Sequence, residues 1–293
     1  MNDHRLDQIP EFDHPPKRVI SLWPAITESL FALGFGNSVV GVSDHCIHPA
    51  DKVGALPHPG SPDAPDAAQM KQLNPELVFI SGDETPANVI QKLIDFGLRV
   101  WASSPQMVDE ALDVLRALLA IYHTDKPAVQ INSLQVAVDY ARVAAQGQPK
   151  KRYFCPMRQI EQSGQTCWMS FNQDTYMSDM LHIAGGMNIF AERKQRTPLE
   201  QEIGSTQIEK PVLDSDRYLL VTASDVVDAD PEVILLLEDP FISHPPQRQQ
   251  LVDMLGKTSA VKQGKVFTVP GSLVLWPGVR LGRALQELPE YFR

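Results

Sequence analysis

The chain has 293 residues, of which 43% are hydrophobic and 21% charged, and its formal net charge is -10. This length predicts two domains that can each bury a core, and the composition is that of a globular protein. The negative charge disfavours binding to nucleic-acid backbones, which favour basic surfaces. No apolar run reaches the roughly 18 to 20 residues of a membrane-spanning helix. The three cysteines form no dense disulfide framework, so reduced thiols are expected.

Residues 1–16 are interpreted as an N-terminal extension. They combine charged residues with prolines and lack the apolar centre of a secretory signal. The sequence as written therefore predicts a cytoplasmic protein. If the chain is a mature form, a periplasmic or other extracytoplasmic location is expected instead.

Residues 17–125 alternate short apolar runs with helical patterns, as in an α/β lobe. The strand-like runs cover residues 18–23, 39–42, 77–80 and 99–101. Helical spacing covers residues 27–33, 86–96 and 107–122. Compact apolar runs of this length suit strands buried on both faces. The pattern predicts a mainly parallel sheet flanked by helices.

Residues 126–149 are predicted to form a linker helix. The stretch from Lys126 to Gln146 contains no Gly, opens with Pro127 and is followed by Gly147 and Pro149. About 20 residues span roughly 30 Å, about the width of a small domain. Such a stiff helix can join two lobes across a cleft, a preferred place for a ligand. The alternative is a surface helix within one domain.

Residues 150–293 are predicted to form a second α/β lobe. Strand-like runs cover residues 152–155, 168–171, 233–237 and 266–269, and helical patterns cover 175–184, 224–229 and 278–288. An irregular polar stretch occupies residues 192–216. The sequences Asn74-Pro75-Glu76 and Asp230-Pro231-Glu232 each precede a buried apolar run. Both lobes are therefore expected to use the same supersecondary element.

Several phrases together resemble a known family. In the first lobe they are Arg18-Val-Ile-Ser-Leu-Trp-Pro-Ala-Ile-Thr-Glu28, Leu33-Gly34, Val40-Gly-Val-Ser43 and Asn74-Pro75-Glu76-Leu-Val-Phe79. In the second lobe they are Asp179-Met-Leu181, Ala184-Gly-Gly186 and Asn188-Ile-Phe190. Their order and spacing resemble the helical-backbone metal receptors, which are the cobalamin and iron-chelate substrate-binding proteins of ABC importers, of the class III periplasmic binding protein type. The resemblance implies two α/β lobes around one long helix, with ligand bound in the cleft and no catalysis.

The resemblance also implies a ligand and a partner. The ligand is a metal-containing small molecule such as a corrinoid, a ferric siderophore or haem, and no cofactor is required. The partner is an ABC permease, on which family members dock through one exposed glutamate per lobe. The matching places fall near Ala68 and Ser224, which are not acidic, although Asp66 and Asp225 lie close. A second interpretation therefore stays open, a cytoplasmic metal- or cofactor-binding protein with no transporter.

Aromatic residues are candidates for the walls of such a site, because bulky flat ligands need apolar surfaces with a few polar groups. Trp23 ends the first strand, where open α/β sheets place their binding crevice. Trp168, Asp174 and Tyr176 lie in one polar and aromatic phrase, and Trp276 precedes a helix. The alternative for each tryptophan is packing in the core.

The segment from Ser43 to Pro49 concentrates metal-ligand chemistry. Asp44, Cys46 and His48 can converge on an extended segment because alternate side chains share a face. Thiolate and imidazole favour zinc, copper or iron, so Cys46 and His48 are candidate metal ligands. The alternative is a loop in which Asp and His bond to backbone groups. Glu84, after a buried strand, and Arg158 are further candidate ligand contacts.

No enzyme is predicted. The nucleophile elbow, the Walker loop, the dinucleotide glycine pattern and the paired metalloprotease histidines are absent from the sequence. Cys46 beside His45 and His48 leaves a thiol-dependent enzyme as a lesser alternative, which requires the groups to meet in space. Arg280 and Arg283 on the last predicted helix are interpreted as surface charges.

Overall fold

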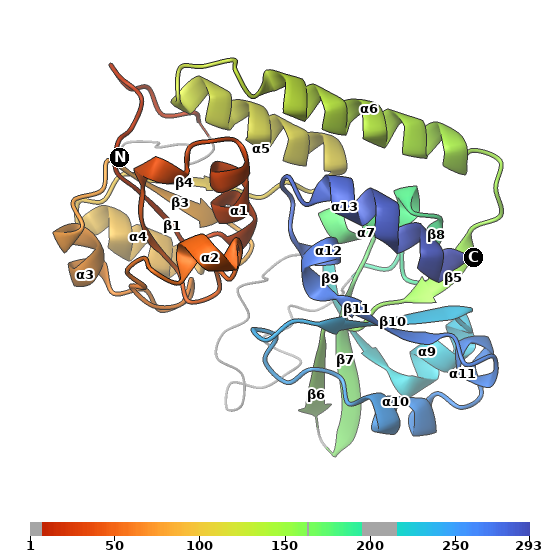
Figure 1. Ribbon diagram of the computed structural model, residues 1–293. Coiled ribbons are helices and arrows are strands. Elements are labelled where there is room, and N and C mark those ends of the chain that lie inside the picture. The colour runs from red at the N-terminus through yellow and green to blue at the C-terminus, as the bar shows by residue number, and fades with distance from the viewer. Residues whose placement is uncertain (1–7, 163, 195–215) are drawn as a thin grey trace. The chain divides into compact units, whose positions relative to one another are not determined.

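The computed structural model describes residues 8–162, 164–194 and 216–293, and the chain forms two compact units. The first unit contains the described residues up to Val136 together with the segment Trp276–Leu281. The second contains the described residues of Ala137–Leu275 and Gly282–Arg293. Figure 1 follows this course from the red and yellow elements of the first unit to the green and blue elements of the second. The irregular stretch expected at 192–216 lies mostly outside the described residues.

The sheet of the first unit is parallel, as the sequence predicted. Its strands are β1 (Val19–Ser21), β2 (Val39–Val42), β3 (Leu77–Ser81) and β4 (Val100–Ser103). Their spatial order is β2-β1-β3-β4, and every neighbouring pair runs parallel. All five residues of β3 are buried, which fits a central strand covered on both faces.

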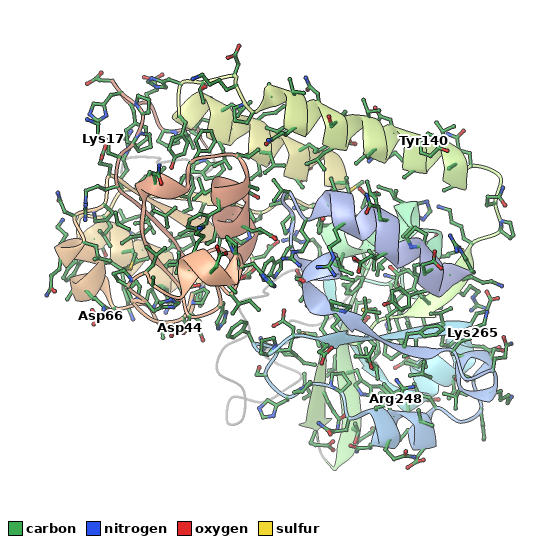
Figure 2. The ribbon with its side chains drawn as sticks, viewed as in Figure 1. Lys17, Asp44, Asp66, Tyr140, Arg248 and Lys265 are labelled. Carbon is green, nitrogen blue, oxygen red and sulfur yellow. The ribbon has the colours of Figure 1, made fainter. Side chains whose placement is uncertain are left out.

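Helices alternate with these strands (Figure 1). They are α1 (Pro24–Ala32), α2 (Ala50–Val53), α3 (Ala67–Gln72), α4 (Ala87–Asp95) and α5 (Val108–Ile121), with a 3-10 turn η1 (Gly36–Ser38). The short helices α2 and α3 were not predicted, because four to six residues give too little periodicity to detect. Asp66 caps α3 by accepting hydrogen bonds from the N–H groups of Ala68 and Gln69 at 2.9 and 3.0 Å. Figure 2 labels Asp66 on this unit.

The long helix α6 (Ala128–Ala145) is continuous over 18 residues and lies within the stretch where the sequence predicted a helix. It is about 27 Å long. The boundary between the two units falls inside it, after Val136. Within the described part of the chain, no helix combines the length and the apolar character needed to cross a membrane.

The second unit contains a parallel sheet and an antiparallel one. The parallel sheet has the order β11-β10-β5-β8, and the antiparallel sheet has the order β6-β7-β9. The strands are β5 (Lys151–Phe154), β6 (Arg158–Gln162), β7 (Gln165–Phe171), β8 (Gly186–Asn188), β9 (Tyr218–Thr222), β10 (Val233–Glu238) and β11 (Val266–Pro270). The sequence did not predict β6, β8 or β9. Because β6 and β7 are joined by two residues, they pair antiparallel, whereas parallel pairing requires a long crossover.

The described helices of the second unit are α7 (Tyr176–Ile183), α9 (Ala223–Ala229), α10 (Arg248–Met254), α11 (Ser259–Lys262), α12 (Gly271–Leu275) and α13 (Leu281–Glu287), followed by the 3-10 turn η2 (Leu288–Phe292). Among them, α7 and α9 lie at the predicted places, the last helix is shifted, and α10, α11 and α12 were not predicted. The sequence predicted the last helix from residue 278, but α13 begins at Leu281. The preceding residues instead pack on the first unit.

A carboxylate turn is repeated in the two parallel sheets. In the first, Glu76 accepts a hydrogen bond from the Lys17 N–H at 2.9 Å and donates its own N–H to the Arg18 carbonyl at 2.7 Å. In the second, Glu232 accepts from the Arg152 N–H at 3.1 Å and donates its N–H to the Arg152 carbonyl at 2.8 Å. Each glutamate thus ties the start of one strand to the start of its neighbour.

The match between the two turns extends to their flanks. Asn74 and Asp230 both adopt left-handed backbone conformations, with φ of 46° and 43°. The Arg18 guanidinium donates to the Leu73 carbonyl at 2.7 Å, and the Arg152 guanidinium donates to the Ala229 carbonyl. The expectation of one shared supersecondary element is therefore confirmed. Asn and Asp tolerate positive φ better than most residues, which explains their place before each proline.

We predict that Glu232→Gln removes an acid-dependent part of the stability. The hydrogen bond from the Arg152 N–H lowers the pKa of Glu232, burial opposes this, and Lys151 at 3.2 Å adds to the lowering. A carboxyl group whose pKa is lower in the folded state than in the unfolded state stabilises the fold at pH values above its unfolded-state pKa. This contribution is lost as the pH falls through the folded-state pKa. The variant should lose about 1 kcal/mol at pH 7 and approach the wild type near pH 3.

Denaturant unfolding at pH 3 to 8 measures this difference. The control is Glu290→Gln, whose carboxylate pairs with Arg293 on the surface with a side chain 58% exposed. A difference between Glu232→Gln and the wild type that does not change with pH contradicts the proposed cause.

Candidate functional site

Polar side chains gather at the carboxyl edge of the first unit's sheet. The four strands are parallel, so their carboxyl ends meet at one edge, where such sheets bind ligands. Ser21 ends β1, Ser43 follows β2 and Ser81 ends β3, and all three are buried. Trp23 follows β1 as the residue before helix α1, and it is only 1% exposed.

Cys46 points into this buried edge. Its Sγ lies within hydrogen-bonding distance of the Thr27 hydroxyl at 3.0 Å, the Ser43 hydroxyl at 3.2 Å and the Ser21 carbonyl at 3.6 Å. Burial raises the pKa of the thiol to about 11, although the hydrogen bonds with Ser43 and Thr27 act in the opposite direction. The charge of Glu84 raises it further. The thiol is therefore protonated at neutral pH.

The structure does not bring Asp44, Cys46 and His48 together. Among the described residues, no group of three or more His, Cys, Asp or Glu side chains is placed to hold a metal ion. The segment turns, because the Cys46 N–H bonds to the Ser43 carbonyl at 3.0 Å, so the alternation of an extended chain does not apply. Asp44, which Figure 2 labels, is exposed. Its carboxylate lies 3.6 Å from His58 Nδ1. The metal site at Cys46 and His48 therefore has no geometric support.

His48 instead contacts a residue from the far end of the chain. Its ring lies edge-on to the Trp276 indole, with 5.7 Å between ring centroids. The Arg280 guanidinium lies over the same indole, 5.0 Å from its centroid. Glu28 accepts two hydrogen bonds from Arg280, at 2.8 and 2.6 Å. Four residues from three distant segments of the sequence thus form one aromatic and ionic cluster in the first unit.

Arg280 was wrongly interpreted as a surface charge, since it is 8% exposed. A buried guanidinium needs a paired carboxylate, and the planar two-bond pairing with Glu28 supplies it. The sequence did contain one warning against placing Arg280 on the last helix. Pro277 and Gly278 interrupt the helical pattern just before Leu281.

Gly278 allows the segment 276–281 to lie against helix α1. A Cβ at this position would be 2.7 Å from the Ser29 hydroxyl and 2.9 Å from the Ala25 carbonyl oxygen. The Ser29 hydroxyl also accepts a hydrogen bond from the Val279 N–H at 3.2 Å. Close backbone approach therefore fixes the position of Trp276 beside His48.

We predict that Gly278→Ala displaces this segment. Since the added Cβ meets a backbone oxygen, the variant should lose about 2 kcal/mol of stability and change the tryptophan emission spectrum. Thermal unfolding and fluorescence measure both effects. The matched control is Gly256→Ala, whose Cβ would meet its nearest atoms at 3.6 and 3.8 Å. Equal stability of the two variants contradicts the close approach.

The candidate residues of the second unit are dispersed. Trp168 on β7 is fully buried in the core and packs edge-on against Phe154, with 6.0 Å between ring centroids. Tyr176 is buried in the first turn of α7, and the exposed Asp174 precedes that helix. Arg158 is half-buried at the start of β6. Trp168 therefore packs in the core, which was the alternative that the sequence analysis gave for each tryptophan.

We predict that the native protein shows no reactive thiol. Cys46, Cys155 and Cys167 are all buried thiols that form no disulfide. With a pKa of about 11, about one Cys46 in a thousand is ionised at pH 8. A thiol-reactive chromogenic disulfide should therefore label none of the three in native protein and all three in denaturant. Fast labelling of one thiol in folded protein contradicts this burial.

The comparisons with known proteins decide the family. The sequence profile described as "Periplasmic binding protein" matches residues 19–273. The chain belongs to the periplasmic binding protein family. The match begins at β1 and reaches α12, so this family fold includes both units.

Two curated relatives illustrate the sequence similarity. A vitamin B12-binding protein of Vibrio cholerae is 24% identical over 184 residues, which are 63% of this chain and 64% of the relative. An uncharacterized ABC transporter substrate-binding lipoprotein of Bacillus subtilis is 24% identical over 288 residues, covering 94% of this chain and 79% of that protein. This chain therefore covers less than two thirds of the length of the Vibrio cholerae vitamin B12-binding protein.

Solved structures show the same fold. The apo form of a periplasmic heme-binding protein of Roseiflexus sp. RS-1 has a TM-score of 0.73 at 22% identity, covering 94% of this chain and 97% of that one. The vitamin B12-binding protein BtuF of Vibrio cholerae has a TM-score of 0.69 at 22% identity, covering 95% of this chain and 97% of that one. The prediction of a two-lobed α/β binding-protein fold is confirmed.

Proposed function

We propose that this protein is the substrate-binding component of an ABC importer and that it binds a metal-containing small molecule. The ligand is a corrinoid, a haem or a ferric chelate, and the protein acts outside the cytoplasm. The observation that carries the proposal is the family match over residues 19–273, which includes both units. The relatives named for vitamin B12 and heme binding supply the ligand class.

The geometry of the first unit supports a role for His48 and Trp276. Their rings meet edge-on at an interplanar angle of 69° and form an aromatic corner, and aromatic surfaces suit flat or caged ligands. The Glu28–Arg280 ion pair holds this corner in place, so ligand binding should cost little side-chain conformational entropy. Asp44 and Glu84 add carboxylates at the carboxyl ends of β2 and β3. In the second unit, Arg158 is proposed to bind an anionic group of the ligand.

A thiol-dependent reaction is the second function that the sequence left open. It requires an ionised and accessible thiol. Cys46 is 1% exposed, and its pKa of about 11 keeps it protonated. These observations favour binding over catalysis at this edge.

The proposed partner is a permease. Asp66 and Asp225 lie near the places where the resemblance puts docking glutamates. Asp66 caps α3, whereas Asp225 forms a capping box with Thr222 at the start of α9 and pairs with Arg193 at 2.8 Å. Asp66 precedes α3 and Asp225 lies in the first turn of α9, and each of these helices precedes one of the repeated glutamate turns.

We predict that freshly purified protein binds a coloured metal compound. Native mass spectrometry with absorption spectroscopy identifies any retained ligand, and titration with hemin, cyanocobalamin and a ferric hydroxamate ranks the affinities by tryptophan quenching. His48→Ala should weaken the preferred compound by about 10-fold, a loss of about 1.4 kcal/mol. Binding of none of the three compounds contradicts the ligand class.

His123→Asn is the matched control, because His123 is exposed and has a φ of 49° that Asn tolerates. This variant should bind like the wild type. If both histidine variants keep full affinity, the aromatic corner is not part of the site.

A further inference from the structure

Helix α1 carries a buried hydroxyl that contacts three other groups. Thr27 has no exposed surface. Its Oγ1 lies 2.8 Å from the Ser21 hydroxyl, 3.0 Å from Cys46 Sγ and 3.1 Å from the Trp23 carbonyl oxygen. The contact with Trp23 is the ordinary bond of a helical threonine to the carbonyl four residues earlier. The contacts with Ser21 and Cys46 leave the helix and reach the end of β1 and the loop after β2.

The hydroxyls and the thiol form one directed chain of hydrogen bonds. Ser21 donates to the Trp23 carbonyl at 3.2 Å, and Thr27 donates to Ser21. Because Thr27 has then used its one proton, its oxygen accepts from the Cys46 thiol. The raised pKa of this thiol keeps it in the donating form. Bonds of such a buried chain strengthen one another, and removing one member leaves its neighbours without partners.

Thr27 ties Cys46 to another element of the fold. Among the described side chains, Thr27 and Ser43 contact Cys46 Sγ. Ser43 belongs to the same loop, so its contact shapes the loop without attaching it elsewhere. The Ser21 carbonyl, at 3.6 Å, is the longer contact. The Thr27 hydroxyl is therefore the side-chain link between the loop and helix α1.

The Cys46 anchor limits where His48 can lie. His48 follows Cys46 by two residues, and two residues of chain span at most about 7 Å. On the other side, the Pro49 carbonyl accepts hydrogen bonds from the Lys52 and Val53 N–H groups at 3.0 and 3.1 Å, which starts α2. His48 is thus held between two fixed points of the backbone.

The two residues after Thr27 hold the other half of the aromatic corner. Glu28 pairs with Arg280, and the Ser29 hydroxyl accepts from the Val279 N–H at 3.2 Å. Both contacts fix the segment that carries the tryptophan of the corner. Consecutive residues of a helix point about 100° apart, so one turn of α1 can hold a different segment on each side.

We propose that Thr27 is a positioning residue of the aromatic corner. Its hydroxyl fixes Cys46, and this anchor places the His48 ring beside the Trp276 indole. Since Thr27 is fully buried, it acts on a ligand through His48 and without touching the ligand. Its effect on ligand binding rests on the proposed function of the corner, whereas the placement of His48 is a property of the free protein. If Thr27 served stability alone, its loss would leave the His48 ring in place.

Proton NMR of the free protein tests the placement. The ring current of Trp276, 5.7 Å away, shifts the His48 ring protons, and their resonances are identified by their loss in His48→Ala. Thr27→Val removes the hydroxyl, keeps the branched shape and has a similar helix propensity, so the ring-current shift should shrink. Thr27→Ser keeps the hydroxyl and should restore the shift. Unchanged His48 resonances in Thr27→Val overturn the proposal.

Cys46→Ala removes the other end of the same bond and decides the matter if Thr27→Val does not fold. It should move the His48 resonances in the same direction, and the double variant should add little because both changes break one link. The matched control is Ser133→Ala, which removes a bond of a helix hydroxyl to the carbonyl four residues earlier, at 2.8 Å. It should leave His48 unchanged. Additive shifts in the double variant, or an equal shift in the control, overturn the proposal.

Ligand affinity tests the consequence of the placement. The probe is whichever of hemin, cyanocobalamin and the ferric hydroxamate binds most tightly. Thr27→Val should weaken its binding about 5-fold, and Thr27→Ser should bind like the wild type. In the His48→Ala background, Thr27→Val should cause no further loss, and a full further loss overturns action through His48. If His48→Ala itself binds like the wild type, the proposed ligand site is wrong, and the NMR shifts still decide the role of Thr27.

Discussion

In each parallel sheet, a half-buried carboxylate bonds to an N–H near the start of a neighbouring strand and ties the two strand starts together. Glu76 and Glu232 occupy equivalent turns and each returns its own N–H to that same neighbouring strand. A parallel sheet has no tight hairpin to set its register, so a contact between the starts of neighbouring strands contributes strongly to setting that register. Once the starts are aligned, the carboxyl ends meet at one edge. The polar residues at the carboxyl ends of β1, β2 and β3 are neighbours for this reason.

The segment 276–281 shows how a distant part of the chain completes the first unit. Arg280 loses its hydration on burial, and two charge-assisted hydrogen bonds to Glu28 together with the Trp276 ring offset that cost. Gly278 permits the close approach to α1 on which this pairing depends. The result is an ordered aromatic corner of His48 and Trp276. Rigid groups of this kind bind with little loss of side-chain entropy, which supports their proposed role toward a bulky ligand.

The loop after β2 illustrates how burial changes the chemistry of a residue. Asp44, Cys46 and His48 have the donor types of a transition-metal site, yet a turn directs Cys46 inward, where burial keeps its thiol protonated. The same loop leaves His48 in contact with Trp276. The residue types of this loop suggested a metal site. The structure instead shows a buried, hydrogen-bonded Cys46 thiol and an aromatic contact between His48 and Trp276.

The sequence by itself determined the features that local patterns encode. Apolar runs of strand length, the Gly-free stretch of α6 and the repeated Pro-Glu phrases predict most strands of the two parallel sheets, the long helix and the paired turn sequences. Each of these elements is encoded by residues that lie close together in the chain. Only the tertiary structure decided that Trp168 packs in a core, that Arg280 is buried against Glu28, and that Trp276 belongs to the first unit. Those outcomes depend on pairs separated by up to some 250 positions, and the direction of a side chain at such a contact is set by packing. A hydrophobic or charged residue type does not fix that direction in advance.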